Sequence, residues 1–420
     1  MKMKRSSEFV MLLIALCASS CAICSSSLAF SYTLNIFGNA NMDDAINESD
    51  IAYLEDVMAG RSPATELSDA NLDGIVDGKD IEQVERLIDE TGEQLTLKAY
   101  TIYEELMNIT IPMPVESIAV LNLACAESVR GINAQDMVVG VGSSLVEGSN
   151  RDFFPEMIDL PTVGKWSEPD IEAIISLNPD IVIADLRTPD PEKLEDKLEG
   201  TGITVVRMGF TYPGYSLSEI MALGYILDRK DDARELNSFA GKYSDLIEER
   251  VSSIAESERP RVYPIYYTSA DLWKTGSNGS IVDMLCGLAG GENIAHDLTG
   301  GTGGMYPTVD PEWVVGENPQ IIFTWSSPGG YSLANDTAMR ELWTKIVQAP
   351  ELSRVDAAKD ERVHLMTTEI TSRPRWFVGL SYLAKWFYPE KFLDLDPEAI
   401  HKEYLERFQG LEYQGIFVYP

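Results

Sequence analysis

The sequence predicts an α/β fold with two lobes joined by one long helix, and a small all-α domain ahead of them. Three observations support this prediction: short apolar runs alternate with helical patterns from residue 116 onward, one segment of the first half recurs in the second half, and an acidic loop motif occurs twice near the start. Strands that alternate with helices are typical of parallel sheets. A chain of 420 residues, 45% of them hydrophobic, is long enough for several cores.

The first 29 residues have the character of a targeting segment. Three basic residues within the first five precede an apolar stretch at 9–23, and Ser27-Leu28-Ala29 suits a signal peptidase. The tetrapeptide at 18–21 loosely resembles a lipobox, and the apolar stretch is also close to the ~20 residues that span a bilayer. We therefore expect residues 1–29 to be a signal peptide or a membrane anchor. The protein is then exported to the outer face of the cytoplasmic membrane or the cell surface, anchored by leader or lipid, or released.

An acidic loop motif occurs twice between residues 36 and 92, at an offset of 30. In each copy, oxygen-bearing side chains fall at positions 1, 3, 5, 9 and 12, the spacing with which an EF-hand-type loop surrounds calcium. Gly74 takes the sixth position of the second loop, where the turn is sharp. Ile46 and Val76 take the eighth, where paired loops make a short strand contact. A helical pattern follows each copy.

Two such loops, each followed by one helix and ending in Asp, resemble a dockerin domain over residues 36–92. The resemblance implies a module that binds two calcium ions and, as a partner, a cohesin-like protein. Because the module is strongly acidic, we expect its folding to depend on calcium. By this resemblance one ion is held by Asn39, Asn41, Asp43, Asn47 and Asp50, and the other by Asp69, Asn71, Asp73, Asp77 and Asp80.

Residues 93–115 are predicted to be a linker and the first strand region. An N-terminal lobe is expected at 116–229 and a C-terminal lobe at 258–420, because each contains several apolar runs of strand length separated by helical stretches. Candidate strands are 117–122, 137–141, 181–184 and 203–207 in the first lobe, and 261–267, 320–325 and 362–366 in the second.

Residues 230–257 are predicted to form the connecting helix. The stretch is strongly charged, but apolar residues recur at gaps of three and four from Ala233 to Val251, as on one face of an amphipathic helix. A helix of about 25 residues is ~38 Å long at 1.5 Å per residue. We therefore expect a stiff strut rather than a flexible linker.

The two lobes share an internal repeat, because residues 169–183 align with 309–323 at an offset of 140. Each copy is predicted to be a helix that ends at Asn-Pro, followed by a buried strand. Glu172 and Glu312 occupy equivalent places near the helix starts. A duplicated lobe on a strut predicts a cleft between the halves.

Residues 114–410 resemble the solute-binding proteins of ABC importers for iron complexes and vitamin B12, the class with a rigid connecting helix. The tail at 376–390 is similar to archaeal members of the class, and the module ahead of it suggests methanogen relatives. The other matching segments are PTVGKWSEPD at 161–170, LNPDIVI at 177–183, GSNGSIVD at 276–283 and AGGENIA at 289–295.

This second resemblance implies two Rossmann-like lobes, a small-molecule metal chelate as ligand, and an ABC permease with its ATPase subunits on separate chains. In this class, one glutamate on each lobe docks onto arginines of the permease. Glu172 and Glu312 occupy those places.

Ligand contacts in such a fold come from loops at the carboxyl ends of the strands. These loops mix aromatic residues with a few cations, which suits an iron chelate (a siderophore or haem) or cobalamin. A bare metal ion is less favoured because all three histidines lie in the second lobe, although iron held by paired tyrosines stays open. The candidate cleft residues are Asn122, Lys165, Trp166, Arg187, Tyr266, Tyr267, Trp273, Trp325, Glu369, Arg373 and Arg375.

Composition and motifs exclude other classes of function. The net charge of −34 disfavours nucleic acid as a partner, because phosphate binding needs basic patches. Only Cys125 and Cys286 follow the leader, which excludes a disulfide scaffold. We predict that the protein is not an enzyme, since no Cys-His or Ser-His motif stands out. Two alternatives stay open: a cell-surface assembly protein that acts through its dockerin-like module, and a chelatase-like enzyme with a related two-lobed fold.

Overall fold

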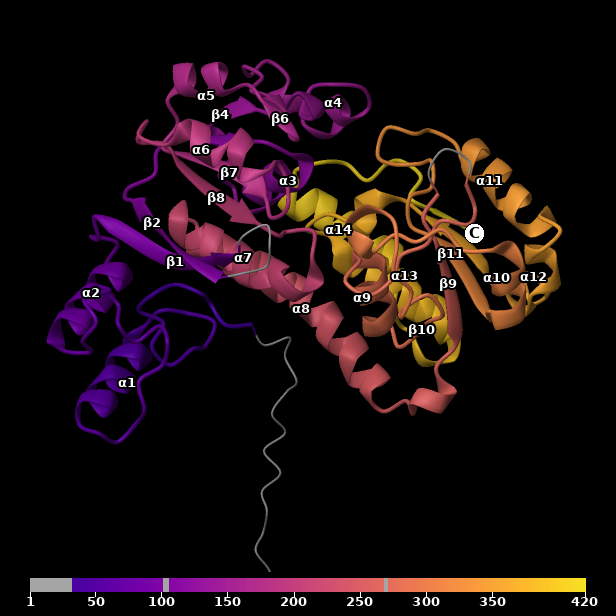
Figure 1. The fold of residues 1–420 in the computed structure, drawn as a ribbon, viewed down its shortest axis with the longest axis horizontal. Coiled ribbons are helices and arrows are strands. Elements are labelled where there is room, and N and C mark those ends of the chain that lie inside the picture. Colours follow the sequence, from indigo (N-terminus) through magenta and orange to yellow (C-terminus); the bar gives the residue numbers. More distant parts are fainter. Residues whose placement is uncertain (1–31, 101–105, 268–270) are drawn as a thin grey trace, which may run out of the picture.

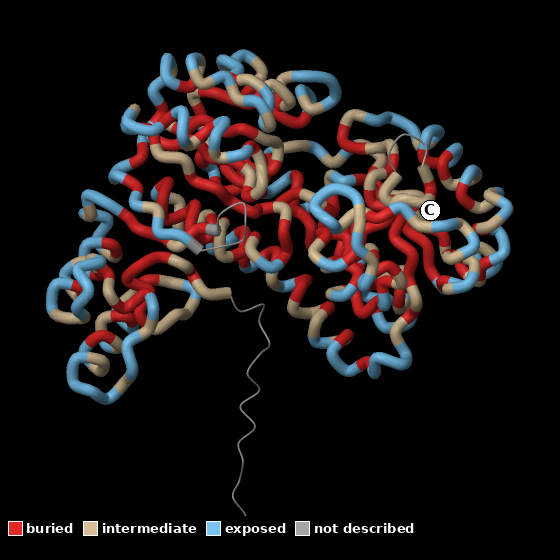
Figure 2. Tube along the Cα trace, in the orientation of Figure 1, coloured by how far each residue is buried: buried red, intermediate tan, exposed pale blue. Residues whose placement is uncertain are grey.

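The computed structural model describes residues 32–100, 106–267 and 271–420, so the expected leader at 1–29 lies outside the described residues (Figure 1). Two α/β lobes are joined by one long helix, as the sequence predicts. A small N-terminal module lies against the first lobe. Figure 2 shows buried residues in the centre of both lobes and in the module.

The N-terminal lobe is built on a four-stranded parallel sheet in the order β4-β3-β7-β8. Its central strands are fully buried apolar runs, as expected where helices cover both faces of a sheet. The strands are β3 (Ile118–Val120), β4 (Val138–Val141), β7 (Ile181–Asp185) and β8 (Thr204–Met208), with a small hairpin of β5 (Gly164–Lys165) and β6 (Glu168–Pro169). The helices are α3 (Leu123–Gly131), α4 (Asn150–Phe153), α5 (Ile171–Leu177), α6 (Glu195–Leu198) and α7 (Pro213–Ile226).

The C-terminal lobe has a five-stranded sheet in the order β10-β9-β11-β12-β13. All neighbours are parallel except β13, which returns antiparallel to β12. The strands are β9 (Arg261–Ile265), β10 (Glu292–Asn293), β11 (Ile321–Thr324), β12 (Val363–Met366) and β13 (Val418–Tyr419). The helices are α9 (Ile281–Leu288), α10 (Pro311–Glu317), α11 (Thr337–Gln348), α12 (Asp356–Lys359), α13 (Trp376–Phe387) and α14 (Pro397–Phe408). All seven predicted strands are therefore confirmed, each within a few residues.

The internal repeat is confirmed as a structural unit. Asp170 and Asp310 cap the starts of α5 and α10 with their side chains. Asn178 and Asn318 end the same helices in the left-handed conformation, with φ of 49° and 48°. Asparagine tolerates this conformation better than most residues, and the proline that follows prevents further helix. The same local sequence thus sets the same helix–strand corner in both lobes.

The connecting helix is α8 (Lys230–Ser252), whose 23 residues give a length of ~35 Å. It buries the predicted apolar face, including Leu236, Phe239, Tyr243 and Ile247. The helix ends earlier than residue 257 because residues 256–258 form a separate short turn ahead of β9. It packs against both α7 of the first lobe and α13 of the second.

The N-terminal module contains α1 (Glu48–Met58) and α2 (Gly78–Ile88), each preceded by one acidic loop. Residues 93–115 are predicted to be a linker and the first strand region; the strand part is confirmed, and the segment forms an antiparallel hairpin of β1 (Gln94–Tyr100) and β2 (Leu106–Pro112) rather than a linker. Leu95, Leu97 and Ala99 alternate with polar residues and are buried, so a period of two was present in the sequence. Ile36 bridges to Leu97, which ties the hairpin to the module.

Candidate functional site

The carboxyl ends of both sheets meet between the lobes. Arg187, which follows β7, donates from Nη1 to Sδ of Met305 in the second lobe at 3.3 Å. On another side, Ser332 Oγ donates to the carbonyl of Ser149 at 2.7 Å. Loops after parallel strands are where ligands bind in α/β folds, so the facing loops form the candidate ligand site.

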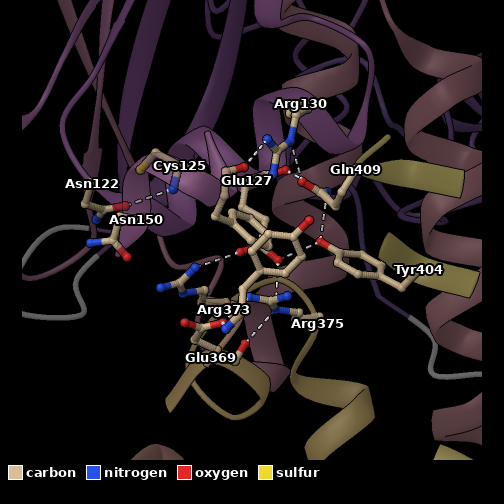
Figure 3. Close-up of polar contacts among 12 residues, drawn as sticks. Asn122, Cys125, Glu127, Arg130, Asn150, Glu369, Arg373, Arg375, Tyr404 and Gln409 are labelled. Atoms are coloured by element: carbon tan, nitrogen blue, oxygen red, sulfur yellow. Dashed lines mark hydrogen bonds and ion pairs between the residues drawn. The ribbon is translucent and has the colours of Figure 1, made fainter. Parts of the chain in front are cut away.

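A buried network of charges joins the lobes at the base of this region (Figure 3). Glu127 of α3 is fully buried, and its Oε1 lies 3.2 Å from Nε of Arg375, which is also fully buried. Tyr404 of α14 donates to the same oxygen at 2.9 Å. The other carboxylate oxygen lies 3.5 Å from Nη1 of Arg373. A carboxylate of the first lobe is thus neutralised entirely by the second.

Arg130 of α3 and Gln409, which follows α14, extend the network. Arg130 donates from Nε to Gln409 at 2.8 Å and pairs with Glu156. Gln409 in turn donates to the carbonyl of Glu127 at 3.2 Å and to the hydroxyl of Tyr404 at 3.0 Å. Charge-assisted bonds of this kind, in a dry interface, fix the relative orientation of the two lobes.

The two arginines predicted for the cleft have different roles. Arg375 is fully buried and donates to Glu369 through both Nε and Nη2, and its Nη1 lies 3.2 Å from Nε2 of His401. It offers no surface to a ligand, so its placement in the cleft is corrected: it holds the lobe together. Arg373 differs, because among the described residues its guanidinium has one polar contact, with Glu127. Its side chain is 9% exposed, and Figure 3 shows its outer end on the side of Asn122 and Asn150.

An aromatic cluster lies at the strand ends of the second lobe. Tyr266 and Trp325 stack with ring centres 4.5 Å apart, and Tyr306 packs on both. Trp325 is buried and its Nε1 has no hydrogen-bond partner among the described residues. Tyr306 was not predicted from the sequence. Since it comes from a glycine-rich segment outside the strands, no periodic pattern marks it.

Other predicted cleft residues lie in varied surroundings. Lys165 and Trp166 are exposed on the β5–β6 hairpin, with Trp166 44% exposed. Tyr267 and Trp273 pack instead against a second hydrophobic core of the C-terminal lobe, which includes Ile265 and Leu365. Their role there is in packing. Asn122 caps α3 by accepting the N–H of Cys125 at 2.8 Å.

Glu369 is also held within the protein. Its Oε2 accepts from Arg375 and, at 3.3 Å, from the backbone N–H of Tyr331. Glu369 therefore positions the loop after β12 beside Arg373.

The repeat-related glutamates are both on the surface. Glu172 and Glu312 lie in the first turns of α5 and α10 and are exposed. Glu312 is paired with Arg354 at 3.0 Å. An exposed pair of this kind contributes little stability. Because Glu172 and Glu312 are both exposed, a partner protein can reach their side chains.

The second acidic loop has the internal hydrogen bonds of a cation-binding turn. The carboxylate of Asp69 accepts the N–H groups of Asp73 and Gly74 at 3.1 and 2.9 Å. Gly74 has a φ of +87°, the conformation that the sixth position requires. Asp80, at the twelfth position, is fully buried and accepts two backbone N–H groups.

The first acidic loop contains a buried oxygen without a donor. Asn39 is fully buried; its Nδ2 donates to the carbonyls of Leu34 and Asp43, and its Oδ1 has no partner among the described residues. Burial raises the pKa of Asp50 to about 6. Asn39 Oδ1 is therefore available to a cation, whereas both oxygens of Asp50 already accept backbone N–H groups. Within the described part of the chain, no three His, Cys, Asp or Glu side chains converge on one metal position. Calcium would therefore depend on asparagine and main-chain oxygens as well.

A buried acid behind the site makes stability depend on pH. Burial raises the pKa of Glu219 on α7 to about 8 from 4.5, and Asp185 adds to the effect. Between pH 4.5 and about pH 8 the folded chain keeps a proton on Glu219 that the unfolded chain releases. The free energy of unfolding therefore falls as pH rises through this range.

We expect Glu219→Gln to remove most of this slope and to stabilise the protein at pH 8 by about 1–3 kcal/mol, because the amide keeps an acceptor for Gly209 N–H without a charge to bury. Thermal unfolding at pH 5 and pH 8 measures it. The exposed Glu235→Gln is the matched control. Equal slopes for wild type and Glu219→Gln contradict the prediction.

Comparisons with known proteins agree with the fold. A family model described as "Periplasmic binding protein" matches residues 118–369. A cobalamin-binding protein of Halobacterium salinarum is 26% identical over 232 residues, which is 51% of this chain and 55% of that protein, so the match spans about half of the relative's length.

The molybdate-binding protein MolA of Haemophilus influenzae is 22% identical over 73% of this chain and 89% of its own, and its molybdate-bound structure, assigned to an ABC transporter, has a TM-score of 0.59. The TroA-like periplasmic binding protein FepB of Veillonella parvula has a TM-score of 0.65 at 22% identity, over 77% of this chain and 99% of that one. The first 117 residues are outside the family match. No helix in the described ranges is long and apolar enough to cross a membrane.

Proposed function

This chain belongs to the periplasmic binding protein family, and from that premise we propose that it is the extracytoplasmic receptor of an ABC importer. In this proposal it captures an iron chelate or cobalamin between its lobes and delivers it to the permease. It carries out no chemistry itself. The relatives that match are named as binding proteins.

The observation that carries the proposal is how few polar contacts Arg373 makes within the protein. A guanidinium has five N–H donors, and a buried one is normally saturated. Arg375 follows that rule, and Arg130 donates from Nε and Nη1 although not from Nη2, whereas Arg373 has one long contact among the described residues. Its remaining donors lie where the strand ends of the two lobes face each other. An anionic or strongly polar group of a bound ligand would satisfy them.

The aromatic cluster supports a bulky ligand. Tyr266 and Tyr306 lie beside Trp325, Lys274 lies over the ring of Tyr266, and Arg187 contacts Met305 from the first lobe. Ring faces and cations together suit a chelate with an apolar body and polar periphery. Cobalamin and molybdate, which relatives bind by name, both offer oxygen-rich groups for Arg373.

The test is a tryptophan-fluorescence titration of the mature chain with ferric siderophores, haem, cobalamin, molybdate and bare metal ions, with calorimetry as a check for coloured ligands. Submicromolar binding of one chelate supports the proposal and names the cargo. Binding of molybdate alone changes the cargo to an oxyanion. A folded protein that binds no member of the panel contradicts the receptor function.

We expect the double variant Glu172→Ala/Glu312→Ala to abolish stimulation of the transporter ATPase and to leave ligand affinity unchanged. Both side chains are exposed at equivalent places on the two lobes, where a permease could contact them together. ATPase assays with the cognate permease and binding titrations measure the two effects. Loss of ligand affinity would instead place these residues in the ligand site.

For the N-terminal module we propose calcium as a bound ion in both acidic loops. Asn39, Asn41, Asp43, Asn47 and Asp50 hold one ion, and Asp69, Asn71, Asp73, Asp77 and Asp80 the other, together with main-chain oxygens. The buried Oδ1 of Asn39 and the sharp turn at Gly74 support this proposal. A cohesin-like protein as partner rests on the sequence resemblance alone.

A further inference from the structure

We infer that the first acidic loop (residues 39–50) has two partners, a cation and helix α7, and thereby couples cation binding in the N-terminal module to the folding of the N-terminal lobe. The module (residues 32–92) is then packed firmly against the rest of the receptor and does not move as an independent domain. The coupling rests on calcium binding by this loop and is independent of which ligand the lobes bind.

The central contact is between Tyr225 of α7 and Ile46 of the loop. The Tyr225 hydroxyl accepts the backbone N–H of Ile46 at 2.8 Å and donates to its carbonyl at 3.4 Å. Ile46 occupies the eighth loop position, which the sequence predicts to pair with Val76. That prediction is wrong among the described residues, because the main-chain groups of Ile46 are taken by the lobe. Both Ile46 and Tyr225 are buried.

Contacts at both ends of the module reinforce this attachment. At its start, Asn237 of α8 donates to the hydroxyl of Tyr32 at 3.0 Å. At its end, Glu90 forms an ion pair with Lys230 at the first turn of α8. Between them, Leu34, Leu54 and other buried apolar residues of the module belong to the same continuous core as α7 and α8.

The β1–β2 hairpin also attaches the module to the rest of the chain. Lys98 N–H donates to the carbonyl of Asn35 at 2.8 Å, and Phe37 N–H donates to that of Thr96 at 2.9 Å. The start of the module is therefore hydrogen-bonded along β1, with an antiparallel bridge between Ile36 and Leu97. Figure 1 shows the hairpin between the module and the first lobe. Folded structure, rather than a flexible linker, therefore joins the module to the first lobe.

The same loop carries the acidic groups that a cation would bind. The carboxylate of Asp43 accepts the N–H of Ala45 and that of Asp50 accepts the N–H of Asn47, both at 2.9 Å, so the two charges lie on either side of Ile46. Asn39 Oδ1, without a donor, is in the same loop. A cation that neutralises Asp43 and Asp50 orders the backbone that Tyr225 holds. Binding to the folded form alone stabilises everything that unfolds with it.

The test is calorimetric unfolding of the full mature chain in EDTA and in calcium, for wild type, Tyr225→Phe and Tyr53→Phe. Tyr53 is a matched control, because its hydroxyl donates to Pro63 within the module. In wild type and Tyr53→Phe we expect the module and N-terminal lobe to unfold in one transition, which calcium raises by on the order of 5 °C. In Tyr225→Phe, where the shared core and the other contacts remain, we expect the calcium shift of this joint transition to become smaller. Hydrogen exchange should show loss of protection at Ile46.

Three results overturn the inference: a separate calcium-dependent transition of the module in wild type, calcium without effect on any wild-type transition, or unchanged coupling and unchanged Ile46 protection in Tyr225→Phe. If Tyr225→Phe fails to fold, Tyr32→Phe serves in its place, because it removes only the hydroxyl that accepts from Asn237. It should weaken the coupling in the same direction, and no change there also contradicts the inference.

Discussion

Replacing Glu127 with Ala is expected to destabilise the protein by about 3–5 kcal/mol, because it removes the buried carboxylate that neutralises Arg373 and, together with Glu369, Arg375. Glu127 and Arg375 are both fully buried, and Tyr404 donates to the same carboxylate. Glu127→Gln should cost less, since the amide oxygen can still accept from Tyr404 although the charge is lost. Denaturant unfolding at pH 7 measures all three proteins.

Glu156→Gln is the control for this prediction. Glu156 pairs with Arg130 in the same network, but its side chain is 33% exposed, so water replaces part of what the substitution removes. We expect a loss of at most about 1 kcal/mol. A Glu127→Ala protein within 1 kcal/mol of wild type would show that the network contributes no net stability.

Arg373→Ala is expected to lower ligand affinity about 100-fold or more while the protein stays folded. Two charge-assisted hydrogen bonds from its spare donors account for a loss of this size. Stability should change little, because the contact removed is a single one of 3.5 Å and Glu127 keeps Arg375 and Tyr404. The fluorescence titration and thermal unfolding report the two quantities separately.

Arg375→Ala provides the contrast two residues away. Its loss leaves the buried Glu127 and the partly buried Glu369 without their main partner, so we expect unfolding or a marked drop in melting temperature. Arg373→Lys keeps the charge and should retain part of the affinity. Wild-type affinity in Arg373→Ala contradicts the role proposed for its unsatisfied donors.

The two-lobed architecture could be predicted because it depends on local patterns. Buried parallel strands appear as apolar runs, and a helix ended by Asn-Pro appears the same way in both lobes, at Asn178 and Asn318. The long helix follows from its apolar spacing. A strand region was predicted at 93–115, but not the pairing of two strands into a hairpin at 94–112, because the alternation in each strand is short and no Gly or Asn marks a turn between them.

The site was harder to predict because residues of one type differ only in their long-range partners. Arg373 and Arg375 are two positions apart, yet one is saturated by the core and the other is not. Tyr266 and Tyr267 are adjacent, yet one joins the aromatic cluster and the other packs in the second core. No spacing rule within either segment separates these outcomes. The attachment of the first loop depends on Tyr225, which lies 179 residues further along the chain.

The partners of Glu127 also govern the order in which the chain can fold. Tyr404 and Gln409 lie 277 and 282 residues beyond it, so the first lobe cannot complete this network until α14 has been synthesised. Contacts this distant in sequence form slowly. A nascent chain that has not reached α14 lacks the tyrosine partner of Glu127, and a copy truncated before Tyr404 lacks it permanently. The network that joins the two lobes therefore forms late in synthesis, and a quality-control protease would meet such truncated copies without it.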